Sequence, residues 1–213
     1  MPRKKRNAQP TLLVVVLDRS GSMASVRDAT VAGFNQLLQE QLALPGEVRL
    51  SLTQFDDRYE PNYVAEPLEN LPPMDAQSYI PRGRTALQDA IGRAIGDTQA
   101  YVESHGWNGQ VCVVVITDGQ ENASLEYAGT SGLAAIASLV RDREDAGWTF
   151  AFMGANMDSW AVAGELGMTT AVNWAPTAVG VASVWGSTSA AVSSYRVSGM
   201  YPQVSATTGR TAT

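Results

Sequence analysis

A chain of 213 residues, of which 45% are hydrophobic and 17% are charged, is long enough to bury one sizeable core, and this composition argues against disorder over most of its length. The formal net charge is −6, and four of the fifteen basic residues lie in the first six positions, which leaves eleven basic residues against twenty-one acidic ones. Because such an acidic body would repel phosphates, the composition argues against nucleic acid as a partner.

The N-terminal segment is basic, and over residues 1–10 we expect a solvated, disordered tail. The apolar run 12–17 is interrupted by Asp18, and no small-residue cleavage site follows it, so we predict no export signal. The sequence also lacks the run of about twenty apolar residues that a membrane span needs. Because the single Cys112 permits no internal disulfide, a cytoplasmic location is the simplest expectation.

Apolar runs with strand character alternate with segments of helical period from residue 11 onward. Residues 11–18 and 111–117 are continuous β-branched runs, which are typical of strands buried on both faces of a parallel sheet. Pro61 lacks a donor for a sheet ladder, which places its strand at an edge. We expect strands at 11–18, 48–55, 59–66, 111–117, 148–155 and 169–174, and helices around 30–42, 85–102, 133–140, 159–166 and 177–195.

Strands that alternate with helices imply right-handed crossovers, and therefore an α/β fold with a mostly parallel sheet and helices on both faces. We take residues 11–196 as one domain and residues 197–213, which are rich in Ser, Thr and Gly, as a disordered tail. The last helix is itself rich in Gly, Ala and Ser, which favours loose packing. In such sheets ligands bind beyond the carboxyl ends of the strands, so the side chains there are the functional candidates.

Three short polar segments are expected at that edge. Residues 18–22, Asp-Arg-Ser-Gly-Ser, follow the first strand, and Gly21 within them is able to take a backbone conformation that other residues resist. Residues 117–119, Thr-Asp-Gly, follow the second buried strand, and residues 83–85, Gly-Arg-Thr, precede a helix. The candidate ligand atoms are all oxygens, from the side chains of Asp18, Ser20, Ser22, Thr85 and Asp118, with Thr117 as a sixth candidate.

Oxygen ligands suit hard cations, so we predict a site for Mg²⁺, with Mn²⁺ or Ca²⁺ as alternatives, and not for Zn²⁺ or Cu²⁺. Two carboxylates could neutralise a divalent ion. If one or both of them act through water, however, the neutral hydroxyls leave the ion under-compensated. The ion would then attract a carboxylate from outside, so the site would bind rather than react.

The stretches DRSGSM, GRTAL and ITDGQEN resemble the metal-ion-dependent adhesion site of von Willebrand factor A domains. The family's pattern, Asp-x-Ser-x-Ser with a distant Thr and a distant Asp, is complete here, and the likeness extends over roughly residues 11–195, including the order of elements. The resemblance implies a six-stranded, Rossmann-like sheet with one antiparallel edge strand. It also implies metal coordination by Asp18, Ser20, Ser22, Thr85 and Asp118.

The resemblance further implies one coordination position that accepts an Asp or Glu of a partner protein. Family members include adhesion receptors, but many bacterial and intracellular members act as assembly subunits, some of them beside ATPases. We therefore expect a stand-alone intracellular member of the bacterial type, acting as an assembly or adaptor subunit. A membrane partner is not expected.

Each piece of the pattern also has an ordinary structural explanation. Asp-x-Ser-x-Ser before a helix is often a cap with a serine-rich turn, Thr85 alone is typical of a cap, and Thr-Asp-Gly alone is typical of a turn. The conjunction of all three at strand ends and a helix start favours the metal site. Arg82 and Arg84 flank Thr85, where they are either solvated or placed to steer a carboxylate. Other candidates on the same rim, for specificity or for turns, are Asp56, Asp57, Glu121, Asn122, Asn156 and Asp158.

Catalysis is not expected, because the reactive side chains are far from the predicted site. His105 lies about twenty residues along a helix from Thr85, which corresponds to roughly 30 Å. Cys112 precedes Asp118 by about six residues on one strand, which corresponds to roughly 20 Å. Two alternatives stay open: a magnesium-dependent hydrolase that uses the same oxygens, and a structural subunit whose site is empty.

Overall fold

The computed structural model describes residues 9–202. In chain order its elements are β1 (Thr11–Asp18), η1 (Gly21–Val26), α1 (Arg27–Leu42), β2 (Val48–Phe55), β3 (Tyr59–Pro67), η2 (Leu68–Asn70), α2 (Leu87–His105), β4 (Gln110–Thr117), α3 (Gly129–Asp145), β5 (Thr149–Ala155), α4 (Ser159–Glu165), β6 (Ala171–Trp174) and α5 (Ala178–Ser198), where η marks short 3-10 helices. Every strand and α-helix expected from the sequence is present.

Helix α5 continues to Ser198 and so enters the segment 197–213 expected to be a tail. The remainder of that segment from residue 203, and residues 1–8 of the expected N-terminal tail, lie outside the described residues. Within residues 9–202, no helix combines the length and the apolar character that crossing a membrane requires.

The strands form one six-stranded sheet in the order β3-β2-β1-β4-β5-β6. All neighbouring pairs are parallel except β2 and β3, which are antiparallel. Pro61 lies in the edge strand β3, as its missing donor predicts, and the register of β3 against β2 shifts between Leu50 and Thr53. The fold is therefore the expected Rossmann-like α/β sandwich, mostly parallel with one antiparallel edge.

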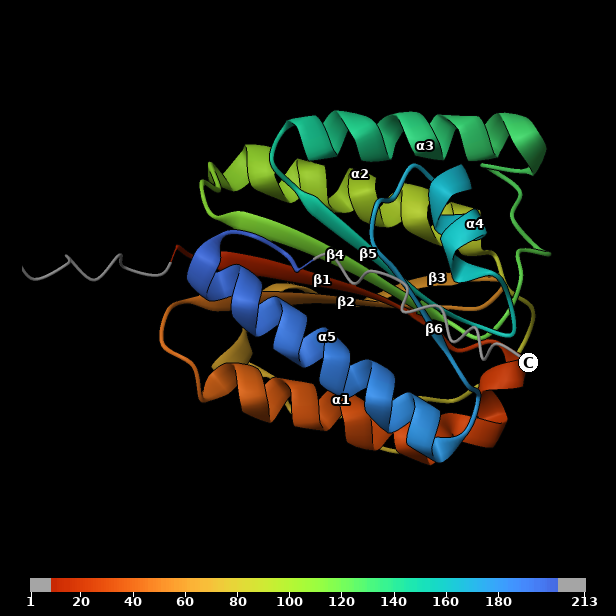
Figure 1. Cartoon of the computed structure of the whole chain (residues 1–213), viewed down its shortest axis with the longest axis horizontal. Coiled ribbons are helices and arrows are strands. Elements are labelled where there is room, and N and C mark those ends of the chain that lie inside the picture. The colour runs from red at the N-terminus through yellow and green to blue at the C-terminus, as the bar shows by residue number, and fades with distance from the viewer. Residues whose placement is uncertain (1–8, 203–213) are drawn as a thin grey trace, which may run out of the picture.

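Helices cover both faces of this sheet, with α1 and α5 on one face and α2, α3 and α4 on the other (Figure 1). Strand β1 shows why two helical layers are needed, because its successive side chains point to opposite faces and all of them are buried. Leu13, Val15 and Leu17 join the core under α1 and α5, and Leu12, Val14 and Val16 join the core under α2 and α3.

Helix α5 packs closely against α1, which differs from the loose packing expected for a helix rich in Gly, Ala and Ser. Trp185 of α5 is only 2% exposed, and its ring meets that of Phe34 edge-on with centroids 5.8 Å apart. Gly33 of α1 permits this approach, because a Cβ at this position would lie 2.2 Å from Trp185 Cδ1. Small residues at this interface therefore bring the two helices together.

Replacing Gly33 with alanine should overpack this interface and lower the free energy of unfolding by about 1–3 kcal/mol. Gly96 provides a matched control, because it lies inside α2, is exposed, and has nothing within 4 Å of a Cβ built on it. Gly96→Ala should instead raise stability by about 0.5–1 kcal/mol through helix propensity. Urea unfolding measures both effects, and a Gly33→Ala variant as stable as the wild type would show that α5 can shift without cost.

Candidate metal centre

The two central strands β1 and β4 end at the same edge of the sheet, where the strand order reverses. The chain builds the sheet outward from β1 through β2 and β3 on one side, and then through β4, β5 and β6 on the other. Ligands of open α/β sheets bind at such a switch point. Asp18 is the last residue of β1, and Asp118 directly follows β4, so both carboxylates lie there.

Asp18 is fully buried, and both of its carboxylate oxygens accept hydrogen bonds. Oδ1 accepts from the backbone N–H of Ser20 at 2.6 Å, and Oδ2 accepts from the hydroxyl of Thr117 at 2.5 Å. Thr117, the sixth ligand candidate, is therefore a donor that orients the Asp18 carboxylate. The hydroxyl of Tyr79 also donates to the backbone oxygen of Asp18, at 2.6 Å. Tyr79 was not predicted, because the proline-rich loop 66–84 shows no period that would single it out.

Ser20, Ser22 and Asp118 form a chain of contacts next to Asp18. The Oγ atoms of Ser20 and Ser22 lie 3.1 Å apart, and the hydroxyl of Ser22 donates to Asp118 Oδ1 at 2.6 Å. Ser20 and Asp118 are buried, whereas Ser22 is exposed. The group therefore reaches from the interior to the surface of this edge.

Thr85 joins the same group at Gly119. A Cβ built on Gly119 would lie 2.9 Å from Thr85 Oγ1, 3.6 Å from Ser22 Oγ and 3.7 Å from Asp18 Oδ2. Oxygens from three segments of the chain thus lie close to Gly119, and a side chain at position 119 would crowd them. The structure brings all five residues of the predicted ligand set together, and the donor set fits a hard cation.

Gly21 does not use the conformational freedom that a glycine has at this position. Its φ lies outside the left-handed region, and a Cβ there would make an ordinary 3.4 Å contact with the backbone oxygen of Gly83. Gly83 instead has a φ of +67°, and a Cβ on it would lie 2.4 Å from Asp57 Oδ1. Of these two glycines, Gly83, two residues before Thr85, is therefore the one whose backbone conformation favours glycine.

Thr85 is fixed by the loop that follows β4. Helix α2 begins two residues later, at Leu87, and has no side-chain cap, so the hydroxyl of Thr85 does not serve as one. The backbone N–H of Thr85 donates to Asn122 Oδ1, and the N–H of Asn122 donates to the backbone oxygen of Thr85, both at 3.0 Å. Asn122, predicted only as a rim residue, therefore positions Thr85.

A cluster of paired charges braces the loops around the site. Asp56 is fully buried, and its Oδ2 lies 3.1 Å from Arg19 Nε and 2.8 Å from Arg82 Nε. The guanidinium of Arg82 also contacts Glu60 Oε1 at 2.6 Å. The backbone N–H of Arg82 donates to the backbone oxygen of Arg19 at 2.8 Å. Because Arg82 is committed to two carboxylates, it is not free for the steering role considered for it. Arg84 is exposed.

Asp18 and Asp118 differ from Asp56 in having no cationic partner. Burial raises the pKa of Asp18 to about 6, even though hydrogen bonds from Thr117 and Ser20 lower it, and burial also raises the pKa of Asp118. Among residues 9–202, no Lys, Arg or His forms an ion pair with either carboxylate. The same part of the chain contains no group of three His, Cys, Asp or Glu side chains suited to a metal. An ion at this edge would therefore rest on two carboxylates and neutral hydroxyls.

Other rim residues have structural roles. Asp158 caps the N-terminus of α4, and Glu121 accepts from the backbone N–H of Gln88 at 2.8 Å at the start of α2. Asn156 has a φ of +57°, and its amide donates to the backbone oxygen of Asp118 at 3.4 Å. These contacts correspond to the turn-forming alternative for Asn156 and Asp158.

The most reactive side-chain types lie away from this edge. His105 is the last residue of α2, at the opposite end of the helix from Thr85, and stacks on Tyr101 with ring centroids 4.3 Å apart. Cys112 is fully buried in β4, and burial raises the pKa of its thiol. Both positions agree with the spacing in the sequence, and neither residue reaches the candidate centre.

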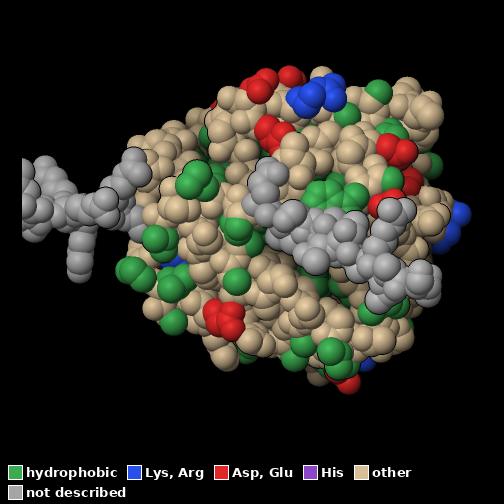
Figure 2. All heavy atoms as spheres, viewed as in Figure 1, with side chains coloured by type: hydrophobic (Ala, Val, Ile, Leu, Met, Phe, Trp, Pro, Cys, Tyr) green, Lys and Arg blue, Asp and Glu red, His purple; other side chains and the backbone are tan. Residues whose placement is uncertain are grey.

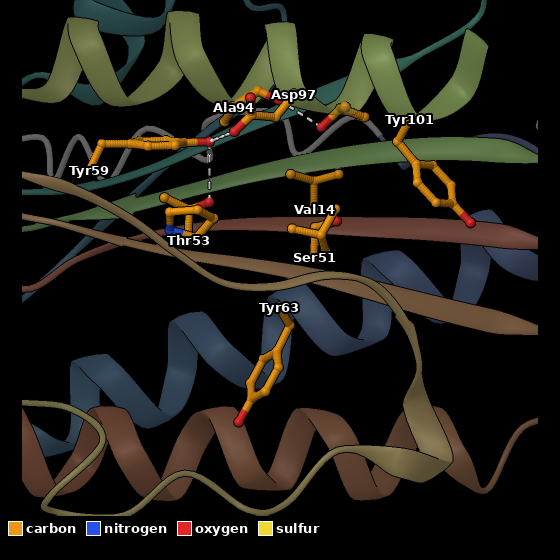
Figure 3. Close-up of a pocket in the computed structure, with 11 residues that line it drawn as sticks. Val14, Ser51, Thr53, Tyr59, Tyr63, Ala94, Asp97 and Tyr101 are labelled. Carbon is orange, nitrogen blue, oxygen red and sulfur yellow. Dashed lines mark hydrogen bonds between the residues drawn. The ribbon is translucent and has the colours of Figure 1, made fainter. Parts of the chain in front are cut away.

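A hollow between β2, β3 and α2 is too small to be an alternative ligand site (Figure 3). The hydroxyl of Tyr59 donates to Asp97 Oδ2 at 2.6 Å beside it, and burial raises the pKa of Tyr59. The volume of the hollow is about 10 Å³, which is close to the minimum for one water molecule. The carboxyl edge therefore remains the candidate functional site.

No protein-family model matches the sequence, and no curated protein matches it either. A solved structure of a von Willebrand factor type A protein from Catenulispora acidiphila matches with a TM-score of 0.58 and 16% identity, over 86% of this chain and 42% of that chain. The von Willebrand factor domain of a type V pilus tip protein from Porphyromonas gingivalis matches with a TM-score of 0.55 and 10% identity, over 85% of this chain and 95% of that chain. An ArnB paralogue from Sulfolobus acidocaldarius matches with a TM-score of 0.54 and 18% identity, over 83% of this chain and 44% of that chain.

The chain spans less than half the length of the first and third of these proteins. At such low identities the likeness shows the fold alone. That fold is the von Willebrand factor A fold, as the motifs in the sequence implied.

The missing counter-charge predicts how the stability of the metal-free protein depends on pH. The folded state raises the pKa of Asp18 from 3.8 to about 6, so it binds more protons than the unfolded state between these values. The contribution of Asp18 to stability is therefore complete below about pH 4 and is lost as the pH rises to about 6, by up to about 3 kcal/mol. Asp18→Asn should remove this slope and, in EDTA, be at least as stable as the wild type at neutral pH.

Asp56→Asn is a matched substitution with the opposite expected result. It leaves Arg19, which is buried, and Arg82 with Glu60 as their remaining carboxylate partner, and should lower stability by about 1–3 kcal/mol. Urea unfolding in EDTA across this pH range measures both variants. If Asp18→Asn were clearly less stable than the wild type at neutral pH, the idea of an uncompensated carboxylate at this position would be wrong.

Proposed function

We propose that this chain is a protein-binding domain in which one divalent cation, held by Asp18, Ser20, Ser22, Thr85 and Asp118, binds a carboxylate of a partner protein. Magnesium is the first choice, because Mg²⁺ prefers oxygen ligands and is usually held by one or two carboxylates together with water and outside oxygens. Mn²⁺ and Ca²⁺ have the same preference for oxygen and remain alternatives.

The contrast between two kinds of buried aspartate carries this proposal. Asp56 has two arginine partners. Asp18 and Asp118 accept hydrogen bonds from hydroxyl and N–H groups, and within residues 9–202 neither of them pairs with a cation. A buried charge without an opposite charge destabilises a fold by several kcal/mol. A cation held between Asp18 and Asp118 would remove that penalty.

The proposed mode of binding follows from the charge of the ligand set. When bound, the ion would supply a positive charge that two carboxylates and neutral hydroxyls compensate only in part. Asp18 and Asp118 would hold it, while Ser20, Ser22 and Thr85 would orient it. Because Ser22 is exposed, the group is open to a partner from the solvent side.

The von Willebrand factor A fold supports a role in binding other proteins, since one neighbour with this fold is a domain of a pilus tip protein. We further propose a cytoplasmic assembly or adaptor subunit, acting in a complex that could contain an ATPase. The single cysteine supports the reducing compartment. A magnesium-dependent hydrolase is the weaker alternative, because His105 and Cys112 both lie away from the carboxyl edge.

Magnesium should stabilise the protein against unfolding. Relative to EDTA, the gain should reach about 2.7 kcal/mol when the metal concentration is about 100 times its dissociation constant. Asp118→Ala should abolish the gain, and Gly119→Ala should reduce it, because the added Cβ would lie 2.9 Å from Thr85 Oγ1. Gly96→Ala, whose Cβ meets nothing, should keep it. Chemical unfolding in the two buffers measures these differences, and a wild type with no gain in magnesium would contradict the metal proposal.

Partner binding should require both the ion and the residues that hold it. The wild-type chain should capture its partner from a cell extract in magnesium but not in EDTA, and Asp18→Ala combined with Ser20→Ala should lose the partner in either buffer. Asp142→Ala, an exposed change on α3, should behave as the wild type. The carboxylate is then identified by Asp→Asn and Glu→Gln substitutions in the partner. Capture unaffected by EDTA, or phosphatase or esterase turnover that Asp118→Ala abolishes, would contradict the proposed function.

A further inference from the structure

A cleft of about 320 Å³ lies beside the candidate metal centre, between the start of α2, the loop after β4, and helices α3 and α4. This volume falls within the range of sites that bind small molecules or single side chains. Its apolar walls are formed by Leu87, Leu133, Met157, Val162 and Leu166. Leu87 and Leu166 are buried, whereas Leu133, Met157 and Val162 are half-buried and line the accessible part.

The cleft and the candidate metal centre are built on the same two segments of the chain. Leu87 follows Thr85 by two residues, and Gln120, which also lines the cleft, follows Asp118 by two. Asn122 ties these segments to each other through its two hydrogen bonds with Thr85. A partner segment bound at the metal centre would therefore have the cleft within reach of its neighbouring side chains.

The charge around the cleft favours a cationic occupant. Glu121 and Glu165 are among its lining residues, and none of the residues that line it is Lys, Arg or His. Figure 2 shows acidic side chains, in red, over the region of α4. Glu165 is exposed at the end of α4, where the last carbonyl groups of the helix add partial negative charge.

One buried acceptor also lacks a donor. The side chain of Gln88, which lines the cleft, is 9% exposed, and its Oε1 has no hydrogen-bond partner within residues 9–202. The last torsion of a glutamine has broad minima, so a small rotation can direct this oxygen to an N–H group in the cleft. An occupant with an apolar stem and N–H donors at its tip would match both the walls and the polar groups.

We propose that the cleft binds a lysine or arginine side chain of the same partner that presents its carboxylate to the metal centre. The aliphatic stem would cover Leu133, Met157 and Val162, and the charged head would lie near Glu165 and Gln88. This inference rests on the proposed function because it assumes the same partner. The binding of a basic side chain in the cleft does not itself require the metal ion. It predicts that the recognised segment carries a basic residue close to its acidic one.

Blocked amino acids test the cleft without the metal centre. The whole ¹⁵N-labelled chain is titrated in EDTA with the Nα-acetyl amides of arginine, lysine and norleucine, none of which carries a carboxylate. The arginine and lysine amides should shift the amide signals of Gln120, Val162 and Leu166 at lower concentration than the norleucine amide. Glu165→Lys should weaken the binding of the arginine and lysine amides by about twofold to fivefold, which is the range expected for the loss of one exposed ion pair.

Glu69→Lys is the matched control, since Glu69 is exposed in η2, which packs near α1 on the other face of the sheet. This variant should bind the probes as the wild type does. Equal or tighter binding of the norleucine amide would replace the proposal with an apolar subsite, and no shift with the basic amides would overturn it. Glu165→Lys should keep the magnesium-dependent gain in stability, so a failure of the cleft proposal is distinguishable from a failure of the metal centre.

Discussion

Two carboxylates buried at the ends of the central strands impose a cost that the rest of the structure has to offset. Asp18 and Asp118 are desolvated and have raised pKa values, so each makes the metal-free fold less stable at neutral pH. They sit at the ends of β1 and β4, which lie in the middle of the sheet and are apolar along nearly all their length. Because these strands bury apolar side chains on both faces of the sheet, they can tolerate an unfavourable charge at one end.

Rigid loops are the second requirement of such a site. The five candidate ligands come from three segments, and a cation site needs its oxygens positioned within narrow limits. Asp56, with Arg19 and Arg82, connects two of these segments, and Asn122 connects Thr85 to the third. These contacts thus hold in place the loops that carry Asp18 and Asp118. Gly119 has no side chain to crowd these oxygens.

The sequence was most informative where a residue's environment depends on its own neighbours along the chain. The β-branched run of β1 and Pro61 of β3 predicted a buried and an edge strand, and the strand-end positions predicted that Asp18 and Asp118 would meet. Contacts between distant segments leave no local pattern, so the donor role of Tyr79 and the pairing of Asp56 could not be predicted. The same limit explains α5, whose close packing depends on Gly33, a residue 152 positions from Trp185.

Selectivity cannot come from the metal contact alone, because every soluble partner offers exposed carboxylates. The proposed ion would accept any of them, so the surrounding surface has to reject most candidates. An edge that carries Glu121 and Glu165 beside the proposed ion would repel a purely acidic segment and attract one in which a basic residue lies close to the acidic one. Two weak contacts on one segment also reinforce each other, since forming the first raises the effective concentration of the second. The acidic cleft would therefore restrict binding to the few proteins that place a basic residue close to the carboxylate bound by the ion.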